Sequence, residues 1–101
     1  MKYKVIISDR AINMLQKHIA FIANVSKASA KKQKDIIIQS IKKLKEDAQI
    51  YPFFENDFIP RNKYHKLVIS KRYIVLYQIK ENIVYVDYII DTRQDYQWLL
   101  K

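Results

Sequence analysis

Basic and aromatic side chains near the ends of predicted strands are the residues in this sequence best suited to chemistry. Arginine and lysine can hold phosphate oxygens and stabilise charge that develops on phosphorus, while tyrosine and histidine can transfer a proton or stack on a base. Because RNA carries its own nucleophile, the 2′-hydroxyl, such groups can cut it without a metal ion. The candidates are Arg61, Lys63, His65, Lys66, Lys71, Arg72, Arg93 and Tyr96.

Each candidate also has a structural interpretation. Lysines and arginines at turns and on edge strands are usually solvated charges that oppose aggregation. A lone histidine that leads a strand, such as His65, is more often structural than catalytic. Asp87 lies in an otherwise apolar segment, so unless it faces solvent its carboxylate needs a partner, for which we expect a lysine or an arginine.

The composition excludes several other kinds of site. The 101 residues contain no glycine and no cysteine, which removes glycine-rich phosphate loops, thiolate zinc sites, thiol catalysis and disulfides. His18 and His65 are the only histidines, and no His-Glu-x-x-His run is present, so we expect neither a metal nor another cofactor. The formal charge of +9 indicates a polyanionic partner, such as a nucleic acid or an acidic protein.

Length and hydropathy predict one domain, residues 1–101, with no membrane segment. The apolar run Val5–Ile7 near the amino terminus is too short for a signal sequence, and no stretch approaches a membrane span. We therefore expect a cytoplasmic protein, in agreement with the absence of cysteine.

A strand and a helical hairpin are predicted in the first half of the chain. The strand spans Tyr3–Ser8. A first helix, capped by Ser8 or Asp9, has helical spacing of its apolar residues and should end near Asn24 to Ser26. A second helix is predicted from Lys27 to Ala48. Five lysines of this helix lie in one arc, either as a solvated face or as a docking site for an acidic partner. They are Lys27, Lys31, Lys34, Lys42 and Lys45.

Three strands and a short helix are predicted in the second half. The strands follow an aromatic-rich connection and span Lys66–Ser70, Tyr73–Lys80 and Ile83–Ile90. Both faces of the last two strands are largely apolar, so we expect helices on one face and a second layer on the other. A helix over Gln94–Leu100 completes an α+β domain of βααβββ order, with the helical hairpin packed on a mainly antiparallel sheet.

The turn between the last two predicted strands contains Glu81 and Asn82. A two-residue turn of this kind needs a positive φ angle, which glycine usually supplies. We expect Asn82 to supply it here, because asparagine tolerates the left-handed conformation better than most residues.

The strand order divides the basic candidates between the two ends of the sheet. His65 and Lys66 begin the first of the three strands, at the end where the Glu81-Asn82 turn lies. The next turn and the end of the last strand lie at the opposite end, so Lys66 can reach them only across a face of the sheet. The residues expected to lie together are Lys71, Arg72, Arg93 and Tyr96.

The stretch Tyr64–Leu100, YHKLVISKRYIVLYQIKENIVYVDYIIDTRQDYQWLL, resembles the RelE/ParE superfamily of toxins from type II toxin-antitoxin systems. The resemblance lies in RYIVLYQI, the tight turn, VYVDYIID and the terminal TRQDY. Lys66 matches the basic residue that opens the first strand, Tyr77 the aromatic run of the second, and Arg93 the arginine after the last strand. The βααβββ order is also that of the superfamily.

The resemblance implies a small basic toxin that an acidic antitoxin, encoded beside it, holds inactive in a hetero-oligomer, often with a role in plasmid stabilisation. RelE-like members enter the ribosome and cleave mRNA as RNA-binding hydrolases, or mRNA interferases. For that activity the resemblance gives Arg93 a phosphate or transition-state contact. It makes Lys66 or His65 a basic group near the message, and Tyr96 an acid/base or stacking group.

The same resemblance leaves a second target open, because ParE-like members poison DNA gyrase by binding. From the sequence we predict mRNA cleavage first and gyrase inhibition as the alternative. One departure counts against cleavage: RelE-like ribonucleases commonly have an arginine directly after the tyrosine of the second strand, and here Ile74 follows Tyr73. A non-toxic basic nucleic-acid-binding domain fits the composition equally well but explains the TRQDY ending less well.

Overall fold

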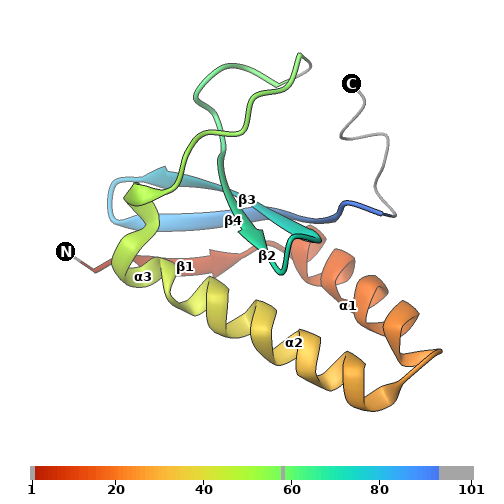
Figure 1. Cartoon of the computed structure of the whole chain (residues 1–101). Coiled ribbons are helices and arrows are strands. Elements are labelled where there is room, and N and C mark those ends of the chain that lie inside the picture. Colours follow the sequence, from red (N-terminus) through yellow and green to blue (C-terminus); the bar gives the residue numbers. More distant parts are fainter. Residues whose placement is uncertain (1, 58, 94–101) are drawn as a thin grey trace.

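One strand, two long helices and three further strands follow one another along the chain (Figure 1). The computed structural model describes residues 2–57 and 59–93. Its elements are β1 (Lys4–Ile7), α1 (Asp9–Ala23), α2 (Lys27–Lys42), α3 (Leu44–Asp47), the short 3-10 helix Ala48–Ile50, β2 (His65–Ile69), β3 (Tyr73–Lys80) and β4 (Ile83–Asp91). The predicted α+β class and βααβββ order are confirmed. The helix predicted over 94–100 lies outside the described residues.

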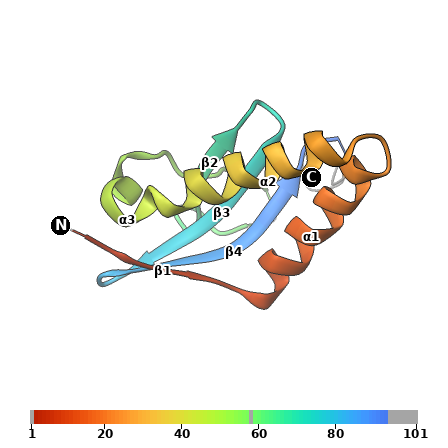
Figure 2. The same ribbon diagram turned by 90° about the horizontal axis from the view of Figure 1, so that it is seen from below.

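The four strands form one mixed sheet in the order β1-β4-β3-β2. β1 runs parallel to β4. Between β1 and the other three strands, the helical hairpin carries the chain across one face of the sheet (Figure 2). β2, β3 and β4 form the antiparallel meander that the short turns predict. Opposite Leu76 and Tyr77 of β3 the register shifts and leaves Asp87 of β4 without a paired residue, which is a β-bulge.

The larger core lies between the helices and the sheet. Tyr73, Val75 and Tyr77 alternate along β3 toward this side and are fully buried, together with Ile37 and Ile41 of α2. Full burial of such a side chain contributes about 1.5–3 kcal/mol. Because these alternate residues of β3 face the helices, the residues between them, Ile74 and Leu76, face the opposite side of the sheet.

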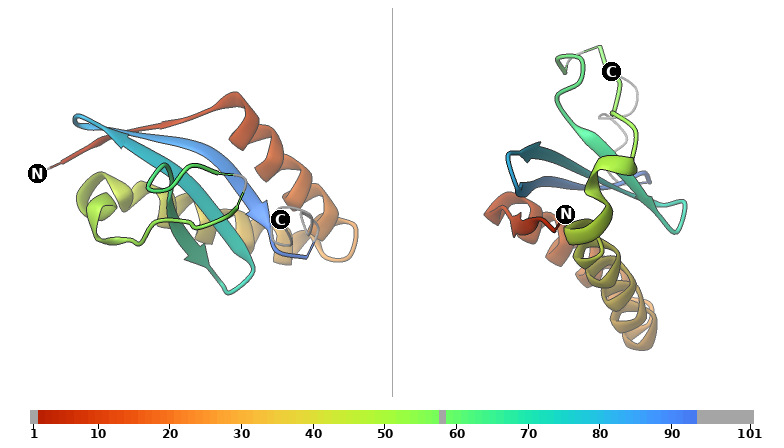
Figure 3. Two further views of the ribbon diagram at one scale, coloured as in Figure 1. Left: turned by 90° about the horizontal axis from the view of Figure 1, so that it is seen from above. Right: turned by 90° about the vertical axis from the view of Figure 1, so that its left-hand side faces the viewer.

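A second apolar layer covers the opposite face of the sheet, as predicted. The connection of residues 51–64 rises over that face (Figure 3), where Phe54 and Tyr64 are buried against Ile74, Leu76 and Ile90. Each of the five side chains is at most 9% exposed. The part of the sheet face beneath this connection is consequently sealed by apolar side chains.

The second helix is shorter than predicted. The expectation of one helix from Lys27 to Ala48 was wrong, because α2 ends at Lys42 and a short α3 follows. Leu44 and Ala48 still reach the core and are 0% exposed. The Tyr3 amide donates to the Lys45 carbonyl at 2.6 Å, which a continuous helix would use internally. This bond lies in α3, beyond the break between the two helices, and joins the segment after α2 to the residue that precedes β1.

The two tight turns that join β2 to β3 and β3 to β4 are built without glycine. Ser70 and Lys71 have φ angles of 54° and 58°, and the Arg72 amide donates to the Ile69 carbonyl at 3.1 Å. Positive φ at both central residues identifies a type I′ hairpin turn between β2 and β3. In the β3–β4 turn Glu81 has the positive φ, 57°, so the expectation for Asn82 was wrong. Because Lys80 pairs with Ile83, Glu81 is the first central residue of the turn, and the left-handed conformation lies there and not at Asn82.

Helix α1 closes the edge of β4 that β1 leaves uncovered. β1 pairs with β4 only as far as Val86. Beyond it the Ser8 hydroxyl donates to the Asp87 carbonyl at 3.3 Å, and His18 Nε2 donates to the Ile89 carbonyl at 2.8 Å. Ser8 also caps α1, accepting from the Ala11 amide at 3.0 Å. His18 is 3% exposed and therefore has a structural role in sheet and helix packing.

Candidate functional site

Three basic residues gather at the end of the sheet where β2 turns into β3 and β4 ends. Lys71 and Arg72 lie in the turn, and the Thr92 amide donates to the Arg72 carbonyl at 2.8 Å. This bond brings Arg93, the next residue, beside the turn. We call Lys71, Arg72 and Arg93 the strand-end basic cluster; it is the group that the strand order predicts, except for Tyr96, which lies outside the described residues.

Asp91 holds Arg93, one member of the cluster. Its carboxylate, on a residue 1% exposed, accepts from the Arg93 backbone amide at 2.8 Å and lies 3.9 Å from Arg93 Nε. The Arg93 side chain itself is 52% exposed. Because the cluster has three cations and the Asp91 carboxylate contacts one of them, Arg93, the cluster keeps a net positive charge and can hold an anionic group such as a phosphate.

His65 and Lys66 lie at the opposite end of β2. At a rise of about 3.3 Å per residue, Lys66 and Ser70 are separated by about 13 Å along the strand. His65 Nδ1 donates to the Tyr51 carbonyl at 2.8 Å, and its ring stacks on Tyr77 at 5.3 Å. The structure therefore does not bring these two residues together with Arg93.

The remaining nucleic-acid-binding candidates lie in the connection of residues 51–64. Arg61 and Lys63 are exposed, and Lys63 Nζ lies 5.4 Å from the centre of the Tyr64 ring. A cation over an aromatic face at an exposed site contributes only about 0.5–1 kcal/mol. Both residues extend the positive surface above the sheet without joining the strand-end basic cluster.

Asp87 has different partners from those expected. Its Oδ2 accepts from the Tyr64 hydroxyl at 3.0 Å and from Gln78 Nε2 at 2.9 Å, so the expectation of a lysine or arginine partner was wrong. Desolvation by burial, followed by the hydrogen bond to Asp87, raises the pKa of Tyr64 to about 12. The bulge, which sequence cannot reveal, points Asp87 toward these neutral donors and makes it an anchor for the connection above the sheet.

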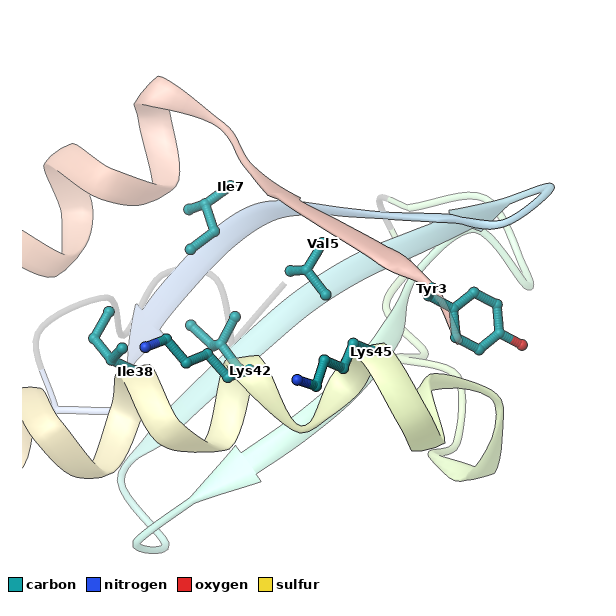
Figure 4. A pocket seen from close by; sticks show the side chains of 7 residues that line it. Tyr3, Val5, Ile7, Ile38, Lys42 and Lys45 are labelled. Atoms are coloured by element: carbon teal, nitrogen blue, oxygen red, sulfur yellow. The ribbon is translucent and has the colours of Figure 1, made fainter. Parts of the chain in front are cut away.

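A groove between β1 and the end of α2 was not predicted. Its volume is about 510 Å³. Figure 4 shows Val5 and Ile7 of β1 on one side and Ile38, Lys42 and Lys45 on the other. The signal in the sequence was present in part, because Lys42 and Lys45 belong to the predicted lysine arc.

The described residues contain neither a metal-binding group of side chains nor a membrane-spanning helix. Among residues 2–57 and 59–93 no group of three histidine, cysteine, aspartate or glutamate side chains is placed to hold a metal ion. None of the described helices has both the length and the hydropathy needed to cross a membrane.

Comparisons with known proteins give a family match and a structural match. A family model described as "ParE toxin of type II toxin-antitoxin system, parDE" matches residues 5–96. A solved structure described as "Chromosomal ParDE TA system from P. aeruginosa" has a TM-score of 0.74 and 13% sequence identity, and the alignment covers 89% of this chain and 96% of that chain. A comparison with curated protein sequences gave no match. The structural likeness supports the fold, and the family match extends over nearly the whole chain.

Proposed function

Because this chain belongs to the ParE toxin family of type II toxin-antitoxin systems, we propose that it stops growth by binding DNA gyrase. Gyrase is the target that the resemblance to ParE-like toxins implies. Inhibition of this kind needs a binding surface and no catalytic residues. Since gyrase acts on chromosomal and plasmid DNA, the proposal implies that the toxin works in the cytoplasm.

The observation that carries this proposal is the separation of the groups that RNA cleavage would use. General acid–base catalysis needs its acid and base within hydrogen-bond reach of one reacting centre. His65 and Lys66 lie at one end of β2, whereas the strand-end basic cluster lies at the other. In addition, His65 Nδ1 already donates to the Tyr51 carbonyl. Positive groups spread over two ends of a sheet suit contact with an extended partner better than attack on one phosphate.

Cleavage of mRNA at the ribosome is the second candidate, and the strand-end basic cluster favours it. Its cations can hold the phosphates on either side of a scissile bond. The resemblance to the superfamily implies that Arg93 contacts the phosphate. Tyr96, the acid/base group implied by the same resemblance, follows Arg93 by three positions. In this alternative the protein is a metal-independent endoribonuclease.

Two reactions run side by side on one toxin preparation distinguish the targets. Purified toxin is added to gyrase with relaxed plasmid and ATP, and to a cell-free translation reaction with labelled message. We expect loss of supercoiling and accumulation of cleaved DNA, with intact message and initially normal amino-acid incorporation. Fragmented message together with normal supercoiling would overturn the gyrase proposal in favour of cleavage.

A pair of arginine substitutions gives an independent test in cells. Arg93→Ala removes the predicted phosphate contact, and Arg61→Ala removes the same charge from the connection of residues 51–64. Because both side chains are largely exposed, each change should alter the free energy of unfolding by less than about 1 kcal/mol. Under the gyrase proposal the two variants have similar toxicity, because each loses one of several positive groups spread over the binding surface. Selective loss of toxicity in a folded Arg93→Ala variant would instead support mRNA cleavage.

A further inference from the structure

The tip of the helical hairpin carries two exposed apolar side chains. Phe21, in the last turn of α1, is 53% exposed, and Val25, in the loop between α1 and α2, is 87% exposed. The core takes other residues of this part of α1, because Ile19 and Ile22 pack against it. Packing within the chain therefore does not explain why Phe21 and Val25 are apolar.

The backbone brings these two side chains to the same side of the tip. Asn24, the residue after α1, keeps helical angles of φ −63° and ψ −25°, and the Val25 amide donates to the Ile22 carbonyl at 3.0 Å. The helical path thus continues to Val25, which follows Phe21 by about one turn. We call Phe21 and Val25 the hairpin-tip pair. Apolar side chains that lie together on an exposed tip are typical of an interaction surface, whereas a single one is not.

The segment around the hairpin-tip pair is basic. Residues 16–34 contain five lysines and neither aspartate nor glutamate. Of these lysines, Lys27 and Lys31 lie in the first two turns of α2 and are exposed. DNA phosphates would match the lysines but offer nothing to two apolar side chains. A partner that takes both must have an apolar pocket with acidic residues around it, because a basic rim would be repelled.

The hairpin tip projects beyond the end of the sheet (Figure 1, Figure 2). Gln33 of α2 donates through Nε2 to the Ser70 hydroxyl in the β2–β3 turn at 3.3 Å. The residues of α2 that precede Gln33 carry the helix about 9 Å farther, at 1.5 Å per residue. Such a projecting tip can enter a cleft of a larger protein.

We propose that the hairpin-tip pair is the apolar anchor by which this chain binds gyrase, in a pocket with an acidic rim; the inference rests on the proposed inhibition of gyrase. DNA-binding surfaces are positively charged, so such a pocket lies away from the surface on which gyrase holds DNA. The toxin and DNA then occupy gyrase together, which accumulation of cleaved DNA requires. The lysines of the tip meet the acidic rim, and the strand-end basic cluster extends the positive surface.

Removal of the two apolar side chains tests the anchor. Binding of labelled full-length toxin to purified gyrase is measured for the wild type and for Phe21→Ser/Val25→Ser. We expect the double variant to bind more weakly by about tenfold or more and to inhibit supercoiling correspondingly less. The matched control is Ile50→Ser/Val68→Ser, which removes two apolar side chains that are 65% and 52% exposed and lie outside the hairpin. It should bind like the wild type, and equal weakening by both double variants overturns the proposal.

Charge reversal tests the acidic rim. Lys27→Glu/Lys31→Glu should weaken gyrase binding by about tenfold or more at low ionic strength. Lys42→Glu/Lys43→Glu makes the same change of charge at exposed positions near the other end of α2 and should weaken it clearly less. Equal weakening overturns the proposal, because only the net charge would then matter. Loading gyrase beforehand with an equimolar DNA duplex should leave the affinity for the toxin unchanged, and displacement of the toxin by this DNA also overturns the proposal.

The outcomes also separate this proposal from the assignment of the target. If Phe21→Ser/Val25→Ser binds and inhibits gyrase as well as the wild type does, the hairpin-tip pair is excluded while gyrase inhibition stands. If this variant loses binding only to the acidic protein encoded by the adjoining reading frame, the pair belongs to the antitoxin contact and the proposal is overturned. If the wild type does not bind gyrase, the proposed function and the role of the hairpin-tip pair are both overturned.

Discussion

Two tyrosines on the same face of β3 provide a matched test of how the core is held together. Tyr73 and Tyr77 are both 0% exposed and belong to the same core between helices and sheet. The Tyr77 hydroxyl donates to the Ala48 carbonyl at 2.6 Å. The Tyr73 hydroxyl is buried and has no hydrogen-bond partner among the described residues. Replacing either tyrosine with phenylalanine removes one oxygen atom and leaves the ring.

The two substitutions should change the free energy of unfolding in opposite directions or by clearly different amounts. Tyr77→Phe leaves the Ala48 carbonyl buried without this donor, and Ala48 is 0% exposed, so we expect a loss of about 1–3 kcal/mol. Tyr73→Phe removes a buried hydroxyl that makes no hydrogen bond, so we expect no loss and up to about 1 kcal/mol of gain.

Urea unfolding of the wild type and of both variants at pH 7.5, followed by circular dichroism, measures this difference. The slope of the free energy with urea should be the same for all three proteins, because the exposed surface on unfolding hardly changes. Equal losses for Tyr73→Phe and Tyr77→Phe would refute the reasoning, since ring packing rather than the hydroxyl bond would then dominate. A loss confined to Tyr73→Phe would refute it outright.

Two further predictions concern the connection above the sheet and the turn without glycine. The pKa of Tyr64 is raised from 10.0 to about 12 in the folded protein. The neutral form therefore contributes its full stability below pH 10, and this contribution is lost as the pH rises toward 12. By pH 11 the free energy of unfolding of the wild type should fall by about 1.4 kcal/mol relative to that of Tyr64→Phe. Urea unfolding of both at pH 8 and pH 11 checks this, and a difference independent of pH contradicts it. Lys71→Gly should raise the free energy of unfolding by about 1 kcal/mol, because φ at Lys71 is 58° and a side chain with Cβ is strained there. Lys71→Ala, which removes the same charge but keeps Cβ, should show no such gain in the same thermal or urea unfolding experiment.

Local patterns in the sequence were sufficient for most of the elements. The helical spacing of apolar residues in α1 and the nearly continuous apolar run in β3 predicted their type and approximate bounds. A helix that packs one face on a core has apolar residues at its own period, and a strand covered on both faces is apolar throughout. The division of the basic candidates between two ends of the sheet also followed from strand order alone. Lys71, Arg72 and Arg93 lie together for that reason.

Long-range contacts decided the features that the sequence did not predict. Nothing near Tyr3 indicates that its amide donates to the Lys45 carbonyl in α3. The end of α2 could not be read from periodicity either, because Leu44 and Ala48 continue the apolar spacing beyond it. The partners of Asp87 are set by a bulge, which depends on how β3 and β4 are paired along their whole length. The roles of His18 and His65, both bonded to distant carbonyls, depend on the tertiary structure in the same way.

The sequence by itself determined a basic chain of 101 residues without glycine or cysteine, the order of its elements and the superfamily it resembles. Composition and period are properties of the chain, so they need no knowledge of what packs against what. The tertiary structure decided that β1 lies parallel to β4 at the edge of the sheet and that a groove with a lysine rim runs beside it. It did so because hydrogen bonds and side-chain packing between residues far apart in the chain, which no local pattern records, fix the relative placement of elements.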